Sequence, residues 1–150
     1  MAALGDNLNR LYDVTPLSET RSYVVKSGST VYEGSFVGIE AATGYVIPWV
    51  NAATGVHNFF LGIATSKVVG DGVLKVQVIK RSILKQVAVT GITTIAGVGK
   101  PIYLIDDGTG ITSVAPAANG INGRVLSFFS STIFDVLIYS DAEYAASAGI

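Results

Sequence analysis

The sequence contains no cysteine and only one histidine, His57. Without cysteine the chain can form no disulfide, present no thiolate nucleophile and bind no metal through sulfur. A Ser–His–Asp triad or a histidine-based zinc site would depend on His57 alone. This residue lies at a predicted junction of loop and strand, where we expect an ordinary polar loop residue. The sequence therefore predicts no catalytic residue, no metal and no cofactor.

Charge is scarce as well. Charged residues make up 14% of the 150 residues, against about 25% in an ordinary soluble domain. The 10 basic and 11 acidic residues nearly cancel, so there is no cationic excess of the kind that binds nucleic acid by releasing counterions. Hydrophobic residues reach 49%, which excludes disorder as the dominant state because disorder accompanies low hydrophobicity and high charge.

Long apolar runs are missing too. The longest uncharged stretch, between Glu40 and Lys67, is interrupted by Pro48 and Asn51 and does not give the roughly 20 apolar residues of a spanning helix. Residues 1–6 show neither the cationic region nor the apolar run of a signal peptide. We therefore expect a soluble chain made in a reducing compartment, with no nucleic-acid and no membrane partner.

Short β-type runs fill most of the chain from Arg21 onward. The clearest alternation sets Leu74, Val76 and Val78 on one face against Lys75 and Gln77 on the other, the period of a half-buried strand. About nine or ten such runs recur at a spacing of roughly 8–12 residues, with no helical segment between them. This pattern predicts an all-β fold, a compact sandwich or barrel-like domain.

The first 20 residues differ from the rest, and we treat residues 1–20 as an N-terminal arm on a β-rich domain of residues 21–150. Four apolar side chains of the arm have the spacing of one stripe of a short helix. They are Leu4, Leu8, Leu11 and Tyr12. Because so short a helix is marginal in water, two alternatives stay open: a frayed terminus, or an arm that orders only against a neighbouring subunit.

Several local signals predict turns and ends. Pro48 lacks a backbone donor, so its strand is expected at a sheet edge or to end there. The stretch Val69–Val73 predicts a hairpin-like turn, and Asp106–Gly110 a turn in preference to a weak calcium site, since the EF-hand spacing is absent. The stretch Ser140–Glu143 matches a capping box and predicts a short C-terminal helix.

The segment Gly97–Pro101 resembles a phosphate loop only superficially. Thr94 stands where the motif needs glycine, and Pro101 stands where it needs the serine or threonine that binds magnesium. We therefore expect a turn that starts a strand. The aromatic residues fall mostly on predicted strands and are expected in the core, with an alternative in which Tyr45 and Trp49 form a platform for a partner or a sugar.

Four short segments, in this order along the chain, resemble one known family. They are Val31–Gly38, Phe60–Ala64, Val98–Tyr103 with its following Asp106–Thr109 turn, and Asn122–Leu126. Together they resemble the small β-rich decoration (cement) proteins of tailed-bacteriophage capsids. The resemblance extends over Ser22–Tyr139.

The resemblance implies a virion protein without catalytic residues that binds the outside of the expanded capsid, often as a trimer, and bridges neighbouring major capsid proteins. It also implies an arm that reaches a neighbour, which matches residues 1–20. The expected partner-binding residues are Leu4, Leu8, Leu11, Tyr12, Tyr45 and Trp49.

The composition suits this role, because a charge-poor apolar chain exposes surface that other chains can cover. Two alternatives remain. One is another virion component, such as a tail tube, head fibre or head-completion protein. The other is a carbohydrate-binding β-sandwich module.

Overall fold

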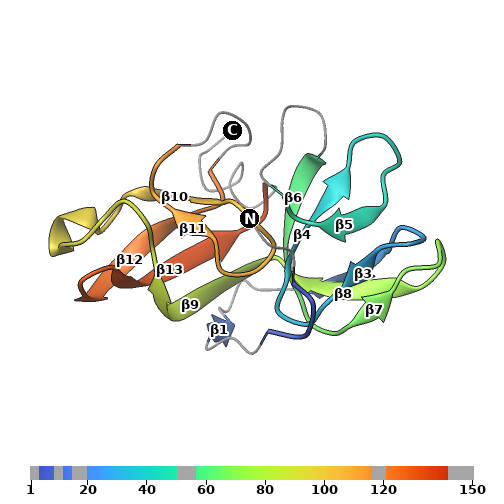
Figure 1. The fold of residues 1–150 in the computed structure, drawn as a ribbon, viewed down its shortest axis with the longest axis horizontal. Helices are drawn as coiled ribbons and strands as arrows, with labels where there is room; N and C mark the ends of the chain where they lie inside the picture. The colour runs from blue at the N-terminus through green and yellow to red at the C-terminus, as the bar shows by residue number, and fades with distance from the viewer. Residues whose placement is uncertain (1–3, 9–11, 15–19, 51–56, 116–120, 142–150) are drawn as a thin grey trace.

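The computed structural model describes residues 4–8, 12–14, 20–50, 57–115 and 121–141 (Figure 1). These residues form thirteen strands and one short 3-10 helix, η1 (Ile95–Gly97), which confirms the all-β class. The strands are β1 (Tyr12–Val14), β2 (Thr20–Val24), β3 (Thr30–Val31), β4 (Phe36–Glu40), β5 (Val46–Pro48), β6 (His57–Ala64), β7 (Val68–Val69), β8 (Lys75–Ile79), β9 (Arg81–Ala88), β10 (Pro101–Leu104), β11 (Ile111–Thr112), β12 (Gly123–Ser130) and β13 (Ile133–Tyr139). The number exceeds the predicted nine or ten because two- and three-residue strands such as β3 and β1 carry too little alternation to be recognised.

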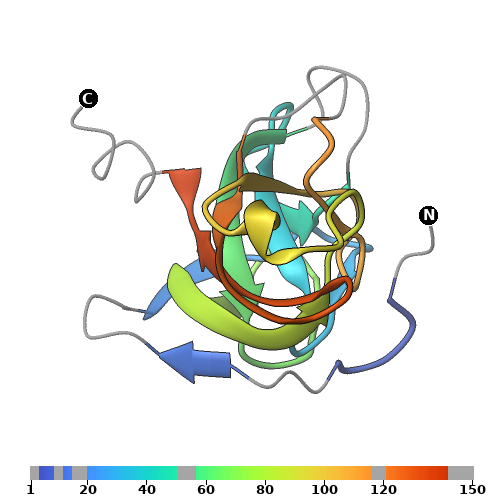
Figure 2. The ribbon, with the colours of Figure 1, turned by 90° about the vertical axis from the view of Figure 1, so that its left-hand side faces the viewer.

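Two main sheets make up the domain. One has the strand order β1-β9-β13-β12-β10-β11 and the other β2-β8-β6-β4-β5, while β3 and β7 form a separate ribbon. Strands β8 and β9 follow each other across Lys80, so the chain passes there from one sheet into the other. The Ser140 N–H donates to the Lys80 carbonyl at 2.8 Å, which closes the corner between the sheets. The strands thus curve around a common core (Figure 2).

The main core lies between these two sheets and draws side chains from both. Phe36 and Phe60 come from the five-stranded sheet, and Phe134 from the six-stranded one. The Phe60 ring meets the Phe36 ring edge to face, with centroids 6.4 Å apart, an arrangement that aromatic pairs prefer. These three residues have the core position expected of strand aromatics, whereas Phe128 and Phe129 are exposed.

Strands β4 and β6 of the five-stranded sheet are buried on both of their faces. A second apolar cluster, which includes Val37, Leu61, Val76 and Val78, lies apart from the main core and includes Val31 of β3. This explains why β4 and β6 read as continuous apolar runs, since a strand covered on both faces needs no polar side. In β8 the alternation of Val76 and Val78 is confirmed.

Two local predictions need correction around β8. Leu74 was placed on the buried face but is 52% exposed, because β8 begins only at Lys75. The turn after Val69 joins β7 to β8, yet β7 pairs with β3, so the two strands do not form a hairpin. The turn itself is present: the Asp71 carboxylate accepts the N–H groups of Val73 and Leu74, and these bonds lower the pKa of Asp71.

Two further predictions concern the end of a strand and the C-terminal part of the chain. Pro48 ends β5, and β5 is an edge strand of the five-stranded sheet, as its missing donor requires. The predicted C-terminal helix falls on residues that, from 142 onward, lie outside the described part of the chain.

Candidate partner-binding surfaces

The described parts of the N-terminal arm lie against the chain's own domain. The Leu4 N–H donates to Asp107 Oδ1 at 3.1 Å, and the Leu8 N–H donates to the Glu33 carbonyl at 2.7 Å. The Glu33 N–H in turn donates to Asn7 Oδ1 at 3.0 Å. For these residues the prediction of an arm that orders only against a neighbouring subunit is wrong, because loops of the same chain supply its hydrogen-bond partners.

The predicted helical stripe is also wrong for the residues the structure describes. Tyr12 begins β1, which extends the six-stranded sheet by pairing with β9, so a sheet edge takes the backbone groups that a helix would have used. Of the four stripe residues, Leu4 and Leu8 are half-buried, and Leu11 lies outside the described residues. Gly34 lets the arm approach closely: with φ at +83°, it has no Cβ where one would stand 2.1 Å from the Leu8 carbonyl oxygen.

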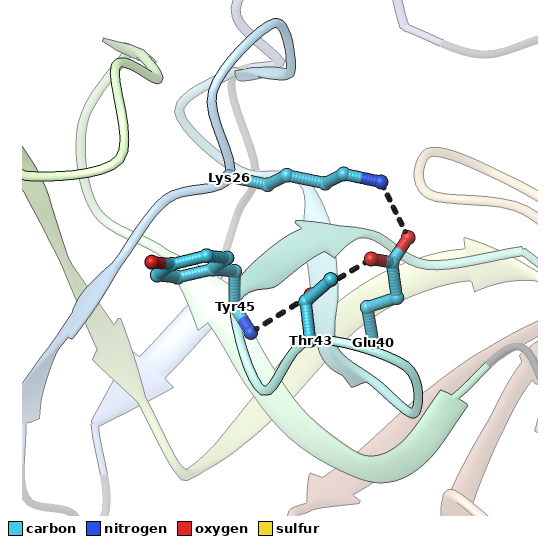
Figure 3. A network of polar contacts seen from close by, with 4 residues as sticks. All are labelled: Lys26, Glu40, Thr43 and Tyr45. Atoms are coloured by element: carbon cyan, nitrogen blue, oxygen red, sulfur yellow. Dashed lines mark hydrogen bonds and ion pairs between the residues drawn. The ribbon is translucent and has the colours of Figure 1, made fainter.

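Tyr45 lies on the turn between β4 and β5, which a network of polar contacts stabilises (Figure 3). Lys26 Nζ pairs with Glu40 Oε2 at 2.9 Å, and Thr43 Oγ1 donates to Glu40 Oε1 at 2.7 Å. The Tyr45 N–H donates to Thr43 Oγ1 at 3.3 Å, so the turn between β4 and β5 holds the tyrosine in place. Its side chain is exposed, and Tyr45 remains a candidate contact residue.

Trp49 is not a partner-facing residue. It is 3% exposed, its Nε1–H donates to the Leu104 carbonyl at 2.9 Å, and its ring lies 5.1 Å from that of Phe60. After Pro48 the chain turns inward, where the indole bridges the two sheets. The predicted platform of Tyr45 with Trp49 is therefore wrong, since the core takes the larger of the two rings.

The turns examined for binding chemistry are explained by backbone hydrogen bonds. Asp106 Oδ1 accepts the N–H groups of Gly108 and Gly110, at 2.9 and 2.8 Å, and so closes the turn between β10 and β11. Lys100 immediately precedes β10, as expected for a turn that starts a strand. Within the described ranges, no three His, Cys, Asp or Glu side chains are grouped so that they could hold a metal ion. The backbone of His57 belongs to β6, and its side chain lies outside the described residues.

Asp141, like Asp71, is a titratable group whose pKa departs from its ordinary value. Burial raises the pKa of the Asp141 carboxyl, although the hydrogen bond from the Phe60 N–H at 2.9 Å works in the opposite direction.

Among the described residues, no helix has the length and apolar character needed to cross a membrane.

The shift of Asp141 predicts a pH dependence of stability. The folded chain binds this proton more tightly than the unfolded chain, so the free energy of unfolding should fall as the pH rises above the ordinary value of 3.8. Urea titrations of the wild type and Asp141→Asn should therefore diverge with rising pH, because asparagine cannot ionise. A constant difference between the two proteins from about pH 3.5 to 7 would contradict the assignment.

A surface that the sequence did not single out lies at one end of the molecule. Three stretches of the chain, residues 86–99, 108–123 and 125–134, contain no charged residue and no histidine. Thr90 bridges to Thr112, the Gly99 N–H donates to the Val125 carbonyl, and Ala88 pairs with Ile133. These contacts gather residues 86–99, 108–115 and 125–134 around η1 and the β12–β13 turn, at the left of Figure 1 and facing the viewer in Figure 2. We call these three ranges the uncharged end.

The uncharged end exposes large apolar side chains. They are Ile95, Val98, Val114, Leu126, Phe128 and Phe129. Ile95 is 70% and Phe129 62% exposed. Absence of charge together with exposed aromatic and aliphatic side chains is what the buried centre of a protein–protein interface looks like. The uncharged end therefore has the character of a surface that another protein chain covers.

The uncharged end was missed because each of its parts looks ordinary in the sequence. The run containing Phe128 and Phe129 has the composition of a core strand, and only the structure shows that β12 after Val125 lies beyond the core. One signal was available: three uncharged stretches separated by only a few charged residues. The order of the strands in the sheet brings these stretches together in space, and composition does not reveal that order.

No family model, curated protein or solved structure matches the chain. Its role is therefore argued from its surfaces.

Proposed function

We propose that the protein is a non-enzymatic virion component that binds the outside of a tailed-phage capsid, as a trimer, and stabilises the expanded head by bridging major capsid proteins. It is made in the host cytoplasm and binds neither nucleic acid nor membrane. The observation that carries the proposal is the uncharged end, with Ile95 and Phe129 each more than half exposed. A small domain that exposes such a surface gains stability when other protein chains cover it.

Contacts between distant parts of the chain support a structural role. The arm is tied to the β-domain through Glu33 and Asp107, and the indole of Trp49 joins the two sheets. A clamp between capsid subunits has to transmit force through such connections, rather than move like an enzyme lid. The carbohydrate-binding alternative is not proposed, because it relied on Trp49 at the surface.

The test is binding to phage heads. Expanded and unexpanded heads, purified without the protein from the phage that carries its gene, are sedimented with the added chain and then heated. We expect the chain to sediment with expanded heads only, and to raise the temperature at which they release DNA. Serum albumin serves as the control that should stay in the supernatant.

Two outcomes would contradict the proposal. One is a chain that stays in the supernatant with both kinds of head and leaves the rupture temperature unchanged. The other is assembly of the chain into tubes in electron micrographs, which would favour a tail component instead.

A further inference from the structure

We infer that copies of this chain join head to tail at the uncharged end, with Phe129 of one copy seated in an apolar pocket of the next. The pocket is lined by Val87, Ala88, Thr109 and Ile111. This inference deepens the proposed function, on which it rests for the number of chains, and it assigns the residues through which those chains meet.

The pocket has the size and character that an aromatic ring needs. It lies between the end of β9 and the turn before β11, with a volume of about 190 Å³. An apolar cavity of roughly 150 Å³ is sufficient to bind benzene. Ala88 and Thr109 are exposed, so the pocket opens to the surface, while the buried Ile111 forms part of its apolar wall.

Phe129 has the properties of an anchor for such a pocket. It lies at the irregularity in β12 between Phe128 and Ser130, where the pairing with β13 shifts register. Phe128 packs its ring edge to face on the buried Phe134, with centroids 5.5 Å apart, and so fixes the strand beside it. Phe129 itself stays 62% exposed. Aromatic side chains that leave water for a fitting pocket contribute a large share of the affinity of protein interfaces.

The two halves of the contact lie close together on one chain. Ala88 is opposite Ile133, and Ile133 is opposite Ser130, so the pocket and the anchor are separated by two strand spacings, about 10 Å. The exposure of Phe129 shows that it does not fill its own chain's pocket. An anchor and a pocket at different places on one chain can pair reciprocally across a two-fold axis or head to tail. The trimer of the proposed function requires the head-to-tail contact, which closes into a ring when the rotation between copies allows it.

A second copy is also the occupant that the charges favour. The surface around the anchor and the pocket comes from stretches without charged residues. The charged side chains beside it are hydrogen-bonded within the chain: Asp135 accepts from the Gln86 N–H and the Ser127 hydroxyl, and Arg124 donates to the Gly99 carbonyl. A partner that covers this surface therefore needs few charges of its own. The uncharged end of another copy meets this condition, because it has the same residues. A different protein on this surface is an outcome that the experiments below separate.

The first test measures mass in solution by sedimentation velocity. Phe129→Asp removes the anchor and Ala88→Trp fills the pocket, and each should raise the dissociation constant of the oligomer at least about 30-fold. Val73→Asp places the same charge on an apolar site outside the uncharged end that is 75% exposed, and it should leave the mass unchanged. Wild-type mass in both Phe129→Asp and Ala88→Trp would overturn the inference.

The second test identifies the contact without removing the anchor. Because the chain has no cysteine, Ser130→Cys beside the anchor and Thr109→Cys at the pocket can be joined selectively by a short bismaleimide. A mixture of the two single variants should give covalent pairs of chains, and the double variant a series that ends at three chains. Each single variant alone should stay a single chain.

Covalent pairs in Ser130→Cys alone would overturn the head-to-tail contact, because they would mean that the two anchors meet each other. Neither test contains a capsid. Loss of capsid binding with intact head-to-tail rings would contradict the proposed function and leave this inference standing. A chain that binds heads but does not join to other copies of itself would contradict this inference and leave the proposed function standing.

Discussion

Replacing Gly62 with alanine is expected to lower the free energy of unfolding by at least about 3 kcal/mol. Gly62 lies in β6 with φ at +135°, a backbone conformation that L side chains rarely adopt. A Cβ there would also stand 2.1 Å from the Ile79 carbonyl oxygen of β8, so backbone has to move at the centre of the five-stranded sheet. Urea denaturation followed by circular dichroism measures the loss.

Gly44→Ala is the matched control. Gly44 has φ at +77°, but a Cβ there meets nothing within 4 Å. Only the conformational penalty applies, about 1–2 kcal/mol. Equal losses in Gly62→Ala and Gly44→Ala would contradict the close contact between β6 and β8.

Trp49→Ala is expected to destabilise the protein by about 3–5 kcal/mol, the usual range for a buried tryptophan. The substitution leaves a cavity between the two sheets beside Phe60 and removes the donor from the buried Leu104 carbonyl. Because Trp49 is the only tryptophan, the loss is measured by circular dichroism rather than by fluorescence.

Trp49→Phe and Tyr45→Ala complete this series. Phenylalanine restores part of the ring volume, so Trp49→Phe should lose less than Trp49→Ala while still leaving the Leu104 carbonyl without its donor. Tyr45 is exposed, and Tyr45→Ala should change the free energy of unfolding by no more than about 0.5 kcal/mol. A near-neutral Trp49→Ala would mean that the indole does not join the sheets and would reopen its role at the surface.

The all-β class could be predicted because it depends on local pattern. Alternation in the stretch containing Val76 and Val78, and a proline at the end of an edge strand, both follow from the chemistry of a few neighbouring residues. The turn at Asp106–Gly110 is of the same kind, since an aspartate and glycines close it with their own backbone groups.

The features that failed depend on contacts between distant residues. Nothing near Tyr12 indicates that β9 offers it a free edge, so the spacing of leucines in the arm favoured a helix. Trp49 follows an edge strand, and only the meeting of β4, β6 and β10 shows that the core receives it. The uncharged end likewise exists only because strand order brings the stretch around η1 beside the β12–β13 turn.

The chain therefore has few charged residues overall, and its uncharged residues are also concentrated in one part of the molecule. A composition with 14% charged residues first indicated only that the chain is apolar. The structure places residues 86–99, 108–115 and 125–134, which carry no charge, at one end of the molecule, and aromatic and aliphatic side chains are exposed there. We interpret this concentration as surface for other copies of the chain and for the capsid beneath them.

Light scattering of the unmodified protein across a range of concentrations tests that claim most directly. We expect a mass of three chains of 15.6 kDa each, with dissociation only on dilution. A mass of one chain at every concentration, up to that of a concentrated stock, would contradict it.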